Sequence, residues 1–447
     1  MSAAQGEGDV GHVAGSDVGV RWVRPAPRDP AADPGRALPV TLADVERARE
    51  VLADVAEVTP LQHARPLSRE AGTPVHLKCE NLQRAGSFKV RGAYVRMAAL
   101  SPEERARGVV AASAGNHAQG VASAAARLGI RARIVMPRGV ALPKLQATRE
   151  HGAEVVLHGS TVDEALAEAQ RHADETGAVF IHPFDSADVV AGQGTVGLEI
   201  LDALPEVDTV IVGIGGGGLI SGVAVAMKER ARLSGREVRV VGVQAAGAAA
   251  YPPSLAEGRA QALEHTSTIA DGIAVGRPGA VPFAIVSALV DAVVTVTDDE
   301  IAAALVHLLE RSKLVVEPAG AVGVAALLSG RVADLGFELG TTAVVLSGGN
   351  IDPMLLLKSI QSGLSAAGRY MTVRIPLRDR PGELATISRI IAEEEANVVR
   401  VDHTRVGPQL SLGGVHITID METRGHEHSL AVLEALRSAG YSPRQHL

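Results

Sequence analysis

The sequence predicts an α/β protein: a large region built on a parallel sheet, followed by a small ferredoxin-like domain. Between Thr41 and about residue 358, apolar runs of four to six residues, rich in Val and Ile, alternate with helical patterns. Strands that alternate with crossover helices form parallel sheets with both faces covered. Residues 370–447 instead follow the order strand, helix, strand, strand, helix, strand, which is typical of a ferredoxin-like domain.

Capping signals predict where the first helices begin. Thr41 is followed by Asp44, an acidic residue three positions on, so a helix is expected over 41–51. Ser101 precedes Pro102 and two glutamates, a cap with proline and acids in the first turn of a second helix. The patterns then predict strands at 109–112, 132–136, 154–157, 178–181, 210–214, 238–243 and 343–346, and helices ending near Gly129 and covering about 144–150, 162–174 and 196–204.

Composition divides the chain into four parts. Residues 1–40 hold six Gly and five Pro and are expected to be a disordered tail. Residues 41–358 form one large region with two α/β subdomains, and the small polar segment 359–369 is a linker. In the small domain, 370–447, we expect strands at 370–376, 398–406, 414–421 and from 441, and helices at 383–394 and 429–438.

Several classes of protein are disfavoured by composition. The formal charge of −8 argues against a nucleic-acid partner, which needs a basic face. The lone Cys79 excludes intrachain disulfides and fits the reducing cytoplasm. The uncharged stretch Thr209–Met227 contains six glycines, so it predicts a strand, a loop and a helix rather than a membrane span. The sequence His426-Glu427-His428 reads as a solvated helix start, and no metal site is expected.

Lys89 is the first residue that could carry chemistry. It is one of only six lysines, lies in the sequence Ser87-Phe88-Lys89-Val90 and precedes a helical pattern. Apolar neighbours would desolvate its amine and lower the pKa, as a Schiff-base lysine requires. A lysine that merely extends from a helix start into water remains an alternative at this point.

The second segment is 113–117, Ser-Ala-Gly-Asn-His, which follows a strand and opens a helix. Free backbone N–H groups at a helix start bind carboxylates and phosphates. Asn116 could equally serve only as a capping residue.

The third segment, Gly213-Ile214-Gly215-Gly216-Gly217-Gly218, formally matches G-x-G-x-x-G. A dinucleotide site needs an acid at the end of the next strand, where this chain has Gln244, so a single phosphate is favoured. A tight helix–strand contact remains the structural alternative. The fourth segment, 347–350, has the sequence Ser-Gly-Gly-Asn at a strand end, where a turn former is the ordinary interpretation.

Together the four segments predict an enzyme that uses pyridoxal phosphate on amino acids. A desolvated lysine would bind the cofactor aldehyde, one helix start its phosphate and another the substrate carboxylate. The segments SFKVRGA, SAGNHAQG, GGGGL, VEPAG and SGGN also resemble, in the same order from about Thr41 to Leu357, the threonine dehydratase family of the tryptophan-synthase-β-like fold (fold type II). The turn Asp379-Arg380-Pro381-Gly382-Glu383-Leu384 resembles that of an ACT domain, a regulatory amino-acid-binding module.

The resemblance implies a role for each matching residue. Lys89 would bind pyridoxal 5′-phosphate covalently and remove the Cα proton of the substrate, and Ser113 would be the second catalytic residue. The cofactor would be held by Phe88, Lys89, Asn116, Gly215, Gly216, Gly217, Gly218, Leu219 and Ser347. The substrate carboxylate would be held by Ser113, Ala114, Gly115, Asn116 and His117, and an effector by Asp379, Gly382 and Leu384.

Two departures from the family pattern narrow the expectation. Serine racemases of the family carry a second serine where this chain has Ala114, so racemisation is not expected. Members with a divalent-metal site carry acids where this chain has Gln244 and, a few residues on, near Ala250, so no magnesium requirement is expected. Glu317, in VEPAG, either orders its region or only caps a loop.

The resemblance thus implies deamination of L-threonine to 2-oxobutanoate and ammonia by β-elimination of water, with L-serine as a second substrate. A β-replacement or synthase enzyme on the same fold, and a catalytically inactive amino-acid-binding regulator, are the alternatives. The expected partners are small amino acids and further copies of the chain, in a dimer or tetramer, with no nucleic acid and no membrane.

Overall fold

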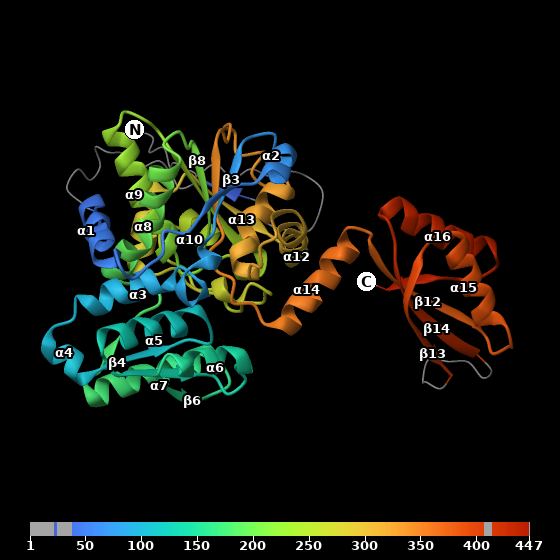
Figure 1. Ribbon diagram of the computed structural model, residues 1–447, viewed down its shortest axis with the longest axis horizontal. Coiled ribbons are helices and arrows are strands. Elements are labelled where there is room, and N and C mark those ends of the chain that lie inside the picture. Colours follow the sequence, from blue (N-terminus) through green and yellow to red (C-terminus); the bar gives the residue numbers. More distant parts are fainter. Residues whose placement is uncertain (1–21, 25–37, 406–413, 447) are drawn as a thin grey trace, which may run out of the picture. The chain divides into compact units, whose positions relative to one another are not determined.

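The computed structural model describes residues 22–24, 38–405 and 414–446 of the chain. It contains two compact units, Met1–Pro353 and Met354–Leu447, and each is described here by itself. Figure 1 shows the elements of both.

The first unit contains two sheets, and its main sheet has seven strands in the order β1-β10-β9-β8-β11-β3-β2. The five strands from β10 to β3 are parallel, whereas β1 and β2 pair antiparallel at the edges. The second sheet, β6-β5-β4-β7, is parallel throughout. The predicted parallel α/β architecture is therefore confirmed. The strands are β1 (Trp22–Val23), β2 (Leu61–His63), β3 (Val75–Lys78), β4 (Val109–Ala112), β5 (Ala132–Met136), β6 (Glu154–Leu157), β7 (Val179–Phe180), β8 (Thr209–Gly213), β9 (Arg239–Ala245), β10 (Ala292–Val296) and β11 (Thr342–Val345).

Helices cover both faces of each sheet, as the buried clusters show. One face of the main sheet packs against α12 and α13, and the other against α8, α9 and α11. The smaller sheet has α5 on one face and α7 on the other. The helices are α1 (Leu42–Leu52), α2 (Arg65–Ala71), α3 (Lys89–Ala98), α4 (Pro102–Arg107), α5 (Asn116–Leu128), α6 (Leu142–Glu150), α7 (Val162–Thr176), α8 (Ala187–Ala203), α9 (Gly218–Leu233), α10 (Tyr251–Ala256), α11 (Ala280–Leu289), α12 (Asp298–His307) and α13 (Pro318–Leu328).

The chain passes between the two sheets twice, through α3 on the way out and α8 on the way back. In Figure 1, α3 lies at the junction between the main sheet and the smaller subdomain that contains α4 to α7. The ends of β4 and β8, which precede two of the predicted site segments, lie in different sheets. The predicted site must therefore form between the subdomains.

The capping predictions are confirmed, but α8 begins earlier than expected. Thr41 and Ser101 both form complete capping boxes. Helix α8 starts at Ala187 rather than near residue 196. Its first half contains Gly192 and Gly194, which weaken a helical pattern. Here they allow close packing, since a Cβ on Gly192 would lie 2.7 Å from the Cα of Gly92 in α3.

The prediction that all of residues 1–40 are disordered is wrong for one short segment. Trp22–Val23 form β1, which pairs with β10, and the Val23 side chain is buried. Two apolar residues are too few to give a periodic pattern, yet they suffice to extend the edge of a sheet. Residues 1–21 and 25–37 of the predicted tail lie outside the described residues.

The second unit contains a four-stranded antiparallel sheet in the order β13-β14-β12-β15. Its core joins α15 and α16 to the sheet through Ile387, Val432 and Ile417. The predicted ferredoxin-like order is confirmed. Residues 359–366 of the expected linker belong to a helix, α14. The elements are α14 (Pro353–Ala366), β12 (Tyr370–Arg378), α15 (Glu383–Glu393), β13 (Asn397–Thr404), β14 (Gly414–Glu422), α16 (His426–Ser438) and β15 (Arg444–His446).

Two negative findings apply to the described part of the chain. None of its helices combines the length and the apolar character that crossing a bilayer requires. In the same residues, no three His, Cys, Asp or Glu side chains are grouped so that they could hold a metal ion.

Candidate active site

Lys89 is the first residue of α3, and its amine points toward the smaller subdomain. The side chain is partly buried, and Nζ donates a hydrogen bond to the Pro183 carbonyl at 3.1 Å. Nζ also lies 5.2 Å from the centre of the Phe88 ring. Burial lowers the pKa of the Lys89 amine to about 8, against a smaller raising effect from Glu317. The amine therefore loses its proton more easily than that of an exposed lysine, as the sequence predicted.

The glycine segment forms the turn from β8 into α9. Gly216 to Leu219 are buried, yet we find no hydrogen-bond acceptor for the backbone N–H groups of Gly215 to Leu219 among the described residues. Buried N–H groups without acceptors are rare in folded proteins. A run of them at the start of a long helix is suited to an anion such as a phosphate.

Neighbouring side chains leave no room for a Cβ at two of the glycines in this turn. A Cβ on Gly216 would overlap the Phe184 ring, and one on Gly217 would overlap the Tyr251 hydroxyl. Gly217 also has a φ of +100°, which other residues rarely adopt. Tyr251 fixes the turn by donating to the Gly216 carbonyl at 3.2 Å. Close packing and an anion site therefore both explain the four glycines.

The Pro183–Phe184 segment joins the lysine to the glycine turn. Its Pro183 carbonyl accepts from Lys89, while the Phe184 ring contacts Gly216. The preceding His182 is held by the Phe184 and Asp185 backbone N–H groups, which donate to its Nδ1. Sequence reasoning did not single out this segment. Its position immediately after β7, at a strand end in a parallel sheet, is the signal that could have found it.

Ser347 lies beside the lysine segment. The Phe88 N–H donates to the Ser347 carbonyl at 3.2 Å, and Ser87 forms an isolated antiparallel bridge with Gly348. The buried Ser347 hydroxyl has a long hydrogen bond, 3.4 Å, to the Ala319 carbonyl. The first and fourth sequence segments, more than 250 residues apart, are thus brought together.

Asn116, the first residue of α5, connects the two subdomains. Its Nδ2 donates to Oε1 of Glu317 at 2.6 Å, and its Oδ1 accepts from Nδ2 of Asn350 at 2.9 Å. Glu317 is only 4% exposed, and its N–H donates to the Gly348 carbonyl at 3.0 Å. Of the two interpretations left open for Glu317, the structure therefore favours the one in which it orders the region. Asn350 was quoted only as part of a motif, and its contacts could not be seen in the sequence.

Ser113 to His117 form the turn between β4 and α5. The Ser113 hydroxyl accepts from the Gly115 N–H at 3.1 Å. In the described residues the N–H groups of Asn116 and His117 have no acceptor, which suits a carboxylate ligand. The His117 side chain points away from such a ligand, because its Nε2 lies 2.8 Å from the Ile181 carbonyl. Burial and the nearby Lys89 charge lower the pKa of His117 to about 3, so it is neutral.

Glu317→Gln is expected to change how stability depends on pH. Burial, together with the Asp271 charge, raises the pKa of Glu317 from 4.5 to about 7. Because the folded protein holds the Glu317 proton more tightly than the unfolded chain, protonated Glu317 stabilises the fold. This stabilisation is complete below pH 4.5 and is lost as pH rises through 7. We expect the variant to be about 2–3 kcal/mol more stable than the parent at pH 8 and nearly equal to it at pH 4.5. Urea unfolding of the two cofactor-free proteins at a series of pH values measures this difference in stability. Parallel curves of unfolding free energy against pH would contradict the prediction.

The predicted effector residues lie together at the turn from β12 to α15. Gly382 precedes α15 with a φ of +93°, Leu384 is 39% exposed, and Asp379 lies 3.5 Å from the Arg405 guanidinium. The three residues are exposed at one turn, and their role toward an effector stays a prediction.

Comparison with known proteins places both units. The family described as pyridoxal-phosphate dependent enzyme matches residues 52–348, and the ACT domain family matches residues 371–440. An L-threonine ammonia-lyase of Geobacter sulfurreducens is 47% identical over 90% of this chain and 98% of its own length. Among solved structures, threonine deaminase isoform 2 of Solanum lycopersicum has 37% identity and a TM-score of 0.68, covering 76% of this chain and 96% of that one. Maize serine racemase has 36% identity and the same TM-score, covering 73% and 98%.

These matches agree with the geometry of the first unit. The lysine, the glycine turn, Asn116 and Ser347 come from four separate segments of the matched range and meet between the two subdomains. The chain belongs to the pyridoxal-phosphate-dependent enzymes of fold type II and carries a C-terminal ACT domain.

Proposed function

We propose that this chain deaminates L-threonine to 2-oxobutanoate and ammonia and converts L-serine to pyruvate in the same way. The observation that carries the proposal is the partly buried Lys89 amine in a site with two sets of backbone N–H groups that have no acceptor in the described part of the chain. One set suits the phosphate of the cofactor, and the other suits the carboxylate of an amino acid. The high identity to a protein described as an L-threonine ammonia-lyase supports the choice of substrate.

The residues present fit pyridoxal phosphate. The N–H groups of Gly215 to Leu219 would hold its phosphate, Phe88 would pack beside its ring, and Asn116 and Ser347 would hydrogen-bond to it. When bound, the cofactor stabilises the electron pair that remains at Cα after a proton is removed. A hydroxyl such as that of Ser347 would not keep the ring nitrogen of the cofactor protonated, as a carboxylate would, and this would favour elimination over transamination.

The remaining steps fall to the chain's own groups. Lys89 Nζ takes the Cα proton, because its lowered pKa leaves much of the amine unprotonated near pH 8. Ser113 and the N–H groups up to His117 hold the substrate carboxylate and so orient the Cα–H bond toward that amine. One proton from Cα and the β-hydroxyl are lost in sum as water, and the resulting enamine tautomerises and takes up one water to give the keto acid and ammonia.

Racemisation is the activity to separate from this proposal, since maize serine racemase is among the similar structures. A racemase needs a second base on the opposite face of the substrate, and Ala114 has no group that can move a proton. We expect keto acid and ammonia from L-threonine and L-serine, with no D-serine. Purified protein that binds the cofactor but forms no keto acid from either substrate would refute the proposal.

We further propose that residues 370–447 bind an amino-acid effector at Asp379, Gly382 and Leu384. Asp379 would pair with the ammonium group, and Gly382 would let the backbone approach closely, since a Cβ there meets nothing within 4 Å. We expect at least one amino acid, with L-isoleucine and L-valine tested first, to change the rate of threonine turnover.

Asp379→Ala is expected to raise the half-effect concentration of that effector by about tenfold or more, as loss of a charged hydrogen bond does. Turnover without effector should stay unchanged. The matched control is Asp402→Ala, which removes an exposed aspartate that pairs with Arg400 in the same unit. Equal responses of both variants would contradict the assignment.

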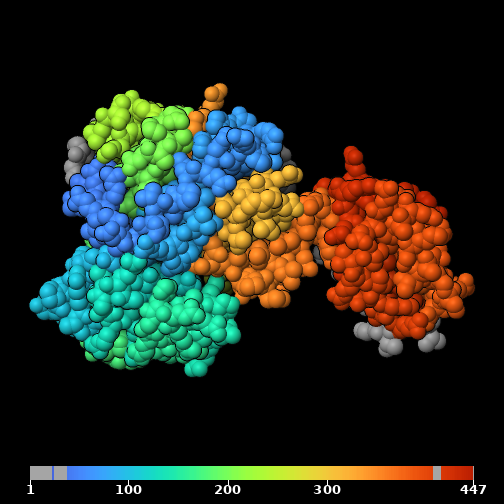
Figure 2. Space-filling model, in the orientation of Figure 1, coloured from blue at the N-terminus to red at the C-terminus, as the bar shows by residue number. Residues whose placement is uncertain are grey.

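We also propose that the chain is cytoplasmic and forms a homo-oligomer. Support for assembly comes from Val58, Leu82 and Val315, which are 78%, 55% and 49% exposed. Their segments adjoin, because Glu57 N–H donates to the Gln83 side chain and Asn81 Nδ2 to the Val315 carbonyl. Figure 2 shows blue and gold parts of the first unit in contact on the face in view. Light scattering that gives a monomer mass at micromolar concentration would contradict the proposal.

A further inference from the structure

Four charged side chains outside the candidate site are buried together. Lys78 and Arg91 are each 1% exposed, Glu80 is fully buried and Glu199 is 10% exposed. We call them the charge quartet. With two positive and two negative groups it is electrically neutral, which is how proteins accommodate charges away from water.

Arg91 lies at the centre of the quartet. Its Nε and Nη2 donate to the two oxygens of Glu80 at 2.8 and 2.9 Å, and its Nη1 and Nη2 donate to those of Glu199 at 2.5 and 3.0 Å. Further bonds reach the Thr195 hydroxyl and the Glu57 carbonyl, both at 3.1 Å. Only a planar guanidinium has enough donors, in a suitable geometry, to grip two carboxylates at once.

The quartet connects four elements of the first unit, since Glu80 begins the short 3₁₀ helix Glu80–Leu82. Lys78, at the end of β3, donates to Glu199 of α8 at 2.6 Å, and Arg91 belongs to α3. Although burial works to raise the pKa of Glu80, the Arg91 charge and hydrogen bonds hold it below its ordinary value. Glu80 therefore keeps its charge beside Arg91, and the quartet joins α3 and α8 to the main sheet.

Arg91 is separated from Lys89 by a single residue, in the first turn of α3. Each helical residue is rotated by about 100° from the one before it. Residues two positions apart are therefore rotated by about 200°, so the two side chains leave the helix on nearly opposite sides. Lys89 points toward Pro183, whereas Arg91 points into the quartet. Arg91 therefore does not reach the reacting atoms, and any effect on them must pass through the helix.

The start of α3 depends on such external contacts. Phe88, which precedes it, provides no side-chain cap. On the far side of the first turn, the Gly92 N–H donates to Oε1 of Gln193 at 3.2 Å, and Gly92 packs closely against Gly192. The first turn is thus held by α8 and the quartet rather than by its own cap.

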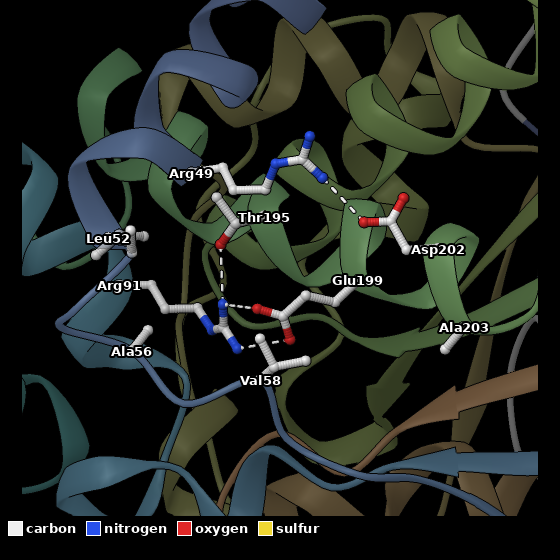
Figure 3. A pocket seen from close by; sticks show the side chains of 10 residues that line it. Arg49, Leu52, Ala56, Val58, Arg91, Thr195, Glu199, Asp202 and Ala203 are labelled. Atoms are coloured by element: carbon white, nitrogen blue, oxygen red, sulfur yellow. Dashed lines mark hydrogen bonds and ion pairs between the residues drawn. The ribbon is translucent and has the colours of Figure 1, made fainter.

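The quartet can be approached without entering the candidate site. A pocket of about 330 Å³ has Arg91, Thr195 and Glu199 among its lining residues. Figure 3 shows the Arg91 guanidinium between Thr195 and Glu199, with a separate Arg49–Asp202 pair nearby. That pair is 2.9 Å apart and its side chains are 43% and 59% exposed. This exposed ion pair lines the same pocket but is not part of the buried quartet, so it provides a control.

We propose that Arg91 is the positioning residue of Lys89: by gripping Glu80 and Glu199 it fixes the first turn of α3 and so holds the Lys89 amine in its site. The inference rests on the proposed role of Lys89 in turnover. It predicts that the shape of the Arg91 group matters, and not only its charge.

The main variant is Arg91→Lys, which keeps the charge but cannot grip two carboxylates. We expect kcat for L-threonine to fall about ten- to a hundredfold, as a misplaced catalytic group causes, with KM changed less than about threefold. The control Arg49→Met should leave both values unchanged.

A second readout does not depend on turnover. Competitive labelling of the cofactor-free protein with acetic anhydride, followed by peptide mapping, gives the pH at which the Lys89 amine becomes reactive. Because the charge at position 91 is kept, a change reports on geometry. We expect the midpoint to rise from about 8 by about one unit in Arg91→Lys, as the amine becomes better solvated, and to stay unchanged in Arg49→Met.

Each outcome decides the inference. A folded Arg91→Lys protein with the parent's kcat and labelling midpoint would overturn it, as would equal effects in Arg49→Met. If Arg91→Lys does not fold by circular dichroism, the second variant is Thr195→Val, which removes the hydroxyl that accepts one hydrogen bond from Arg91. It should shift the midpoint in the same direction by a smaller amount, and no shift would overturn the inference. A parent protein that forms no keto acid would refute the proposed function, while its labelling would still test the positioning of Lys89.

Discussion

Lys89→Ala is expected to lower the turnover of L-threonine by at least about 1,000-fold, because it removes both the covalent attachment of the cofactor and the base that takes the Cα proton. The variant should fold, since the Lys89 side chain makes only one hydrogen bond, to the Pro183 carbonyl, among the described residues. Keto acid formation measures turnover, and circular dichroism checks the fold.

Lys358→Ala is the matched control for this variant. Lys358 lies in α14 and is exposed, so its loss should leave turnover within about twofold of the parent, as for most surface substitutions. If Lys89→Ala retained more than a tenth of the parent's rate, the assignment of Lys89 as base would be wrong. An equal loss in both variants would point to an effect unrelated to the site.

Gly217→Ala should both destabilise the protein and strongly weaken cofactor binding. The positive φ of +100° costs a non-glycine residue about 1–2 kcal/mol, and the overlap with the Tyr251 hydroxyl and with Pro282 adds about 1–3 kcal/mol. Relief of the overlap must move the turn whose N–H groups would hold the phosphate. We therefore expect the free energy of unfolding to be about 2–5 kcal/mol lower than that of the parent. The affinity for the cofactor should fall at least about 100-fold, as when several hydrogen bonds to a charged group are lost.

Gly235→Ala is the control that separates the cost of a positive φ from the cost of steric overlap, because it changes a glycine near the other end of the same helix. Gly235 follows α9, has a φ of +68° and would place a Cβ where nothing lies within 4 Å. It should show only the backbone cost of about 1–2 kcal/mol, with cofactor affinity unchanged. Cofactor titration by absorbance and urea unfolding measure both effects. Normal cofactor affinity in Gly217→Ala would show that the turn does not hold the phosphate.

Local signals in the sequence were enough to predict most of the fold. The capping boxes at Thr41 and Ser101 depend on residues three apart, and β4, β5 and β6 follow from short apolar runs, so all five features were found where expected. Elements were misplaced where packing overrides local preference. The start of α8 contains glycines that its close approach to α3 requires, and β1 is stabilised only by a distant strand.

The candidate site was predictable as segments but not as contacts. The small residues that precede α5 and α9 are visible in the sequence. They mark helix starts at which backbone N–H groups are free to bind an anion. The pairing of Asn116 with Glu317 spans 201 residues, and Tyr251 meets the glycine turn only through the packing of α10. Such contacts depend on how the two subdomains are arranged, which no local pattern encodes. The same holds for the charge quartet, whose four members come from four separate elements.

The central claim is that the Lys89 amine, and none of the other five lysines, binds the cofactor. Reduction of the cofactor-loaded protein with borohydride makes that bond permanent, and digestion with mass spectrometry then identifies the modified peptide. The account predicts one pyridoxyl group per chain, on the peptide that contains Phe88 and Lys89. Modification at any other lysine, or an unmodified Lys89 in protein that turns over threonine, would contradict it.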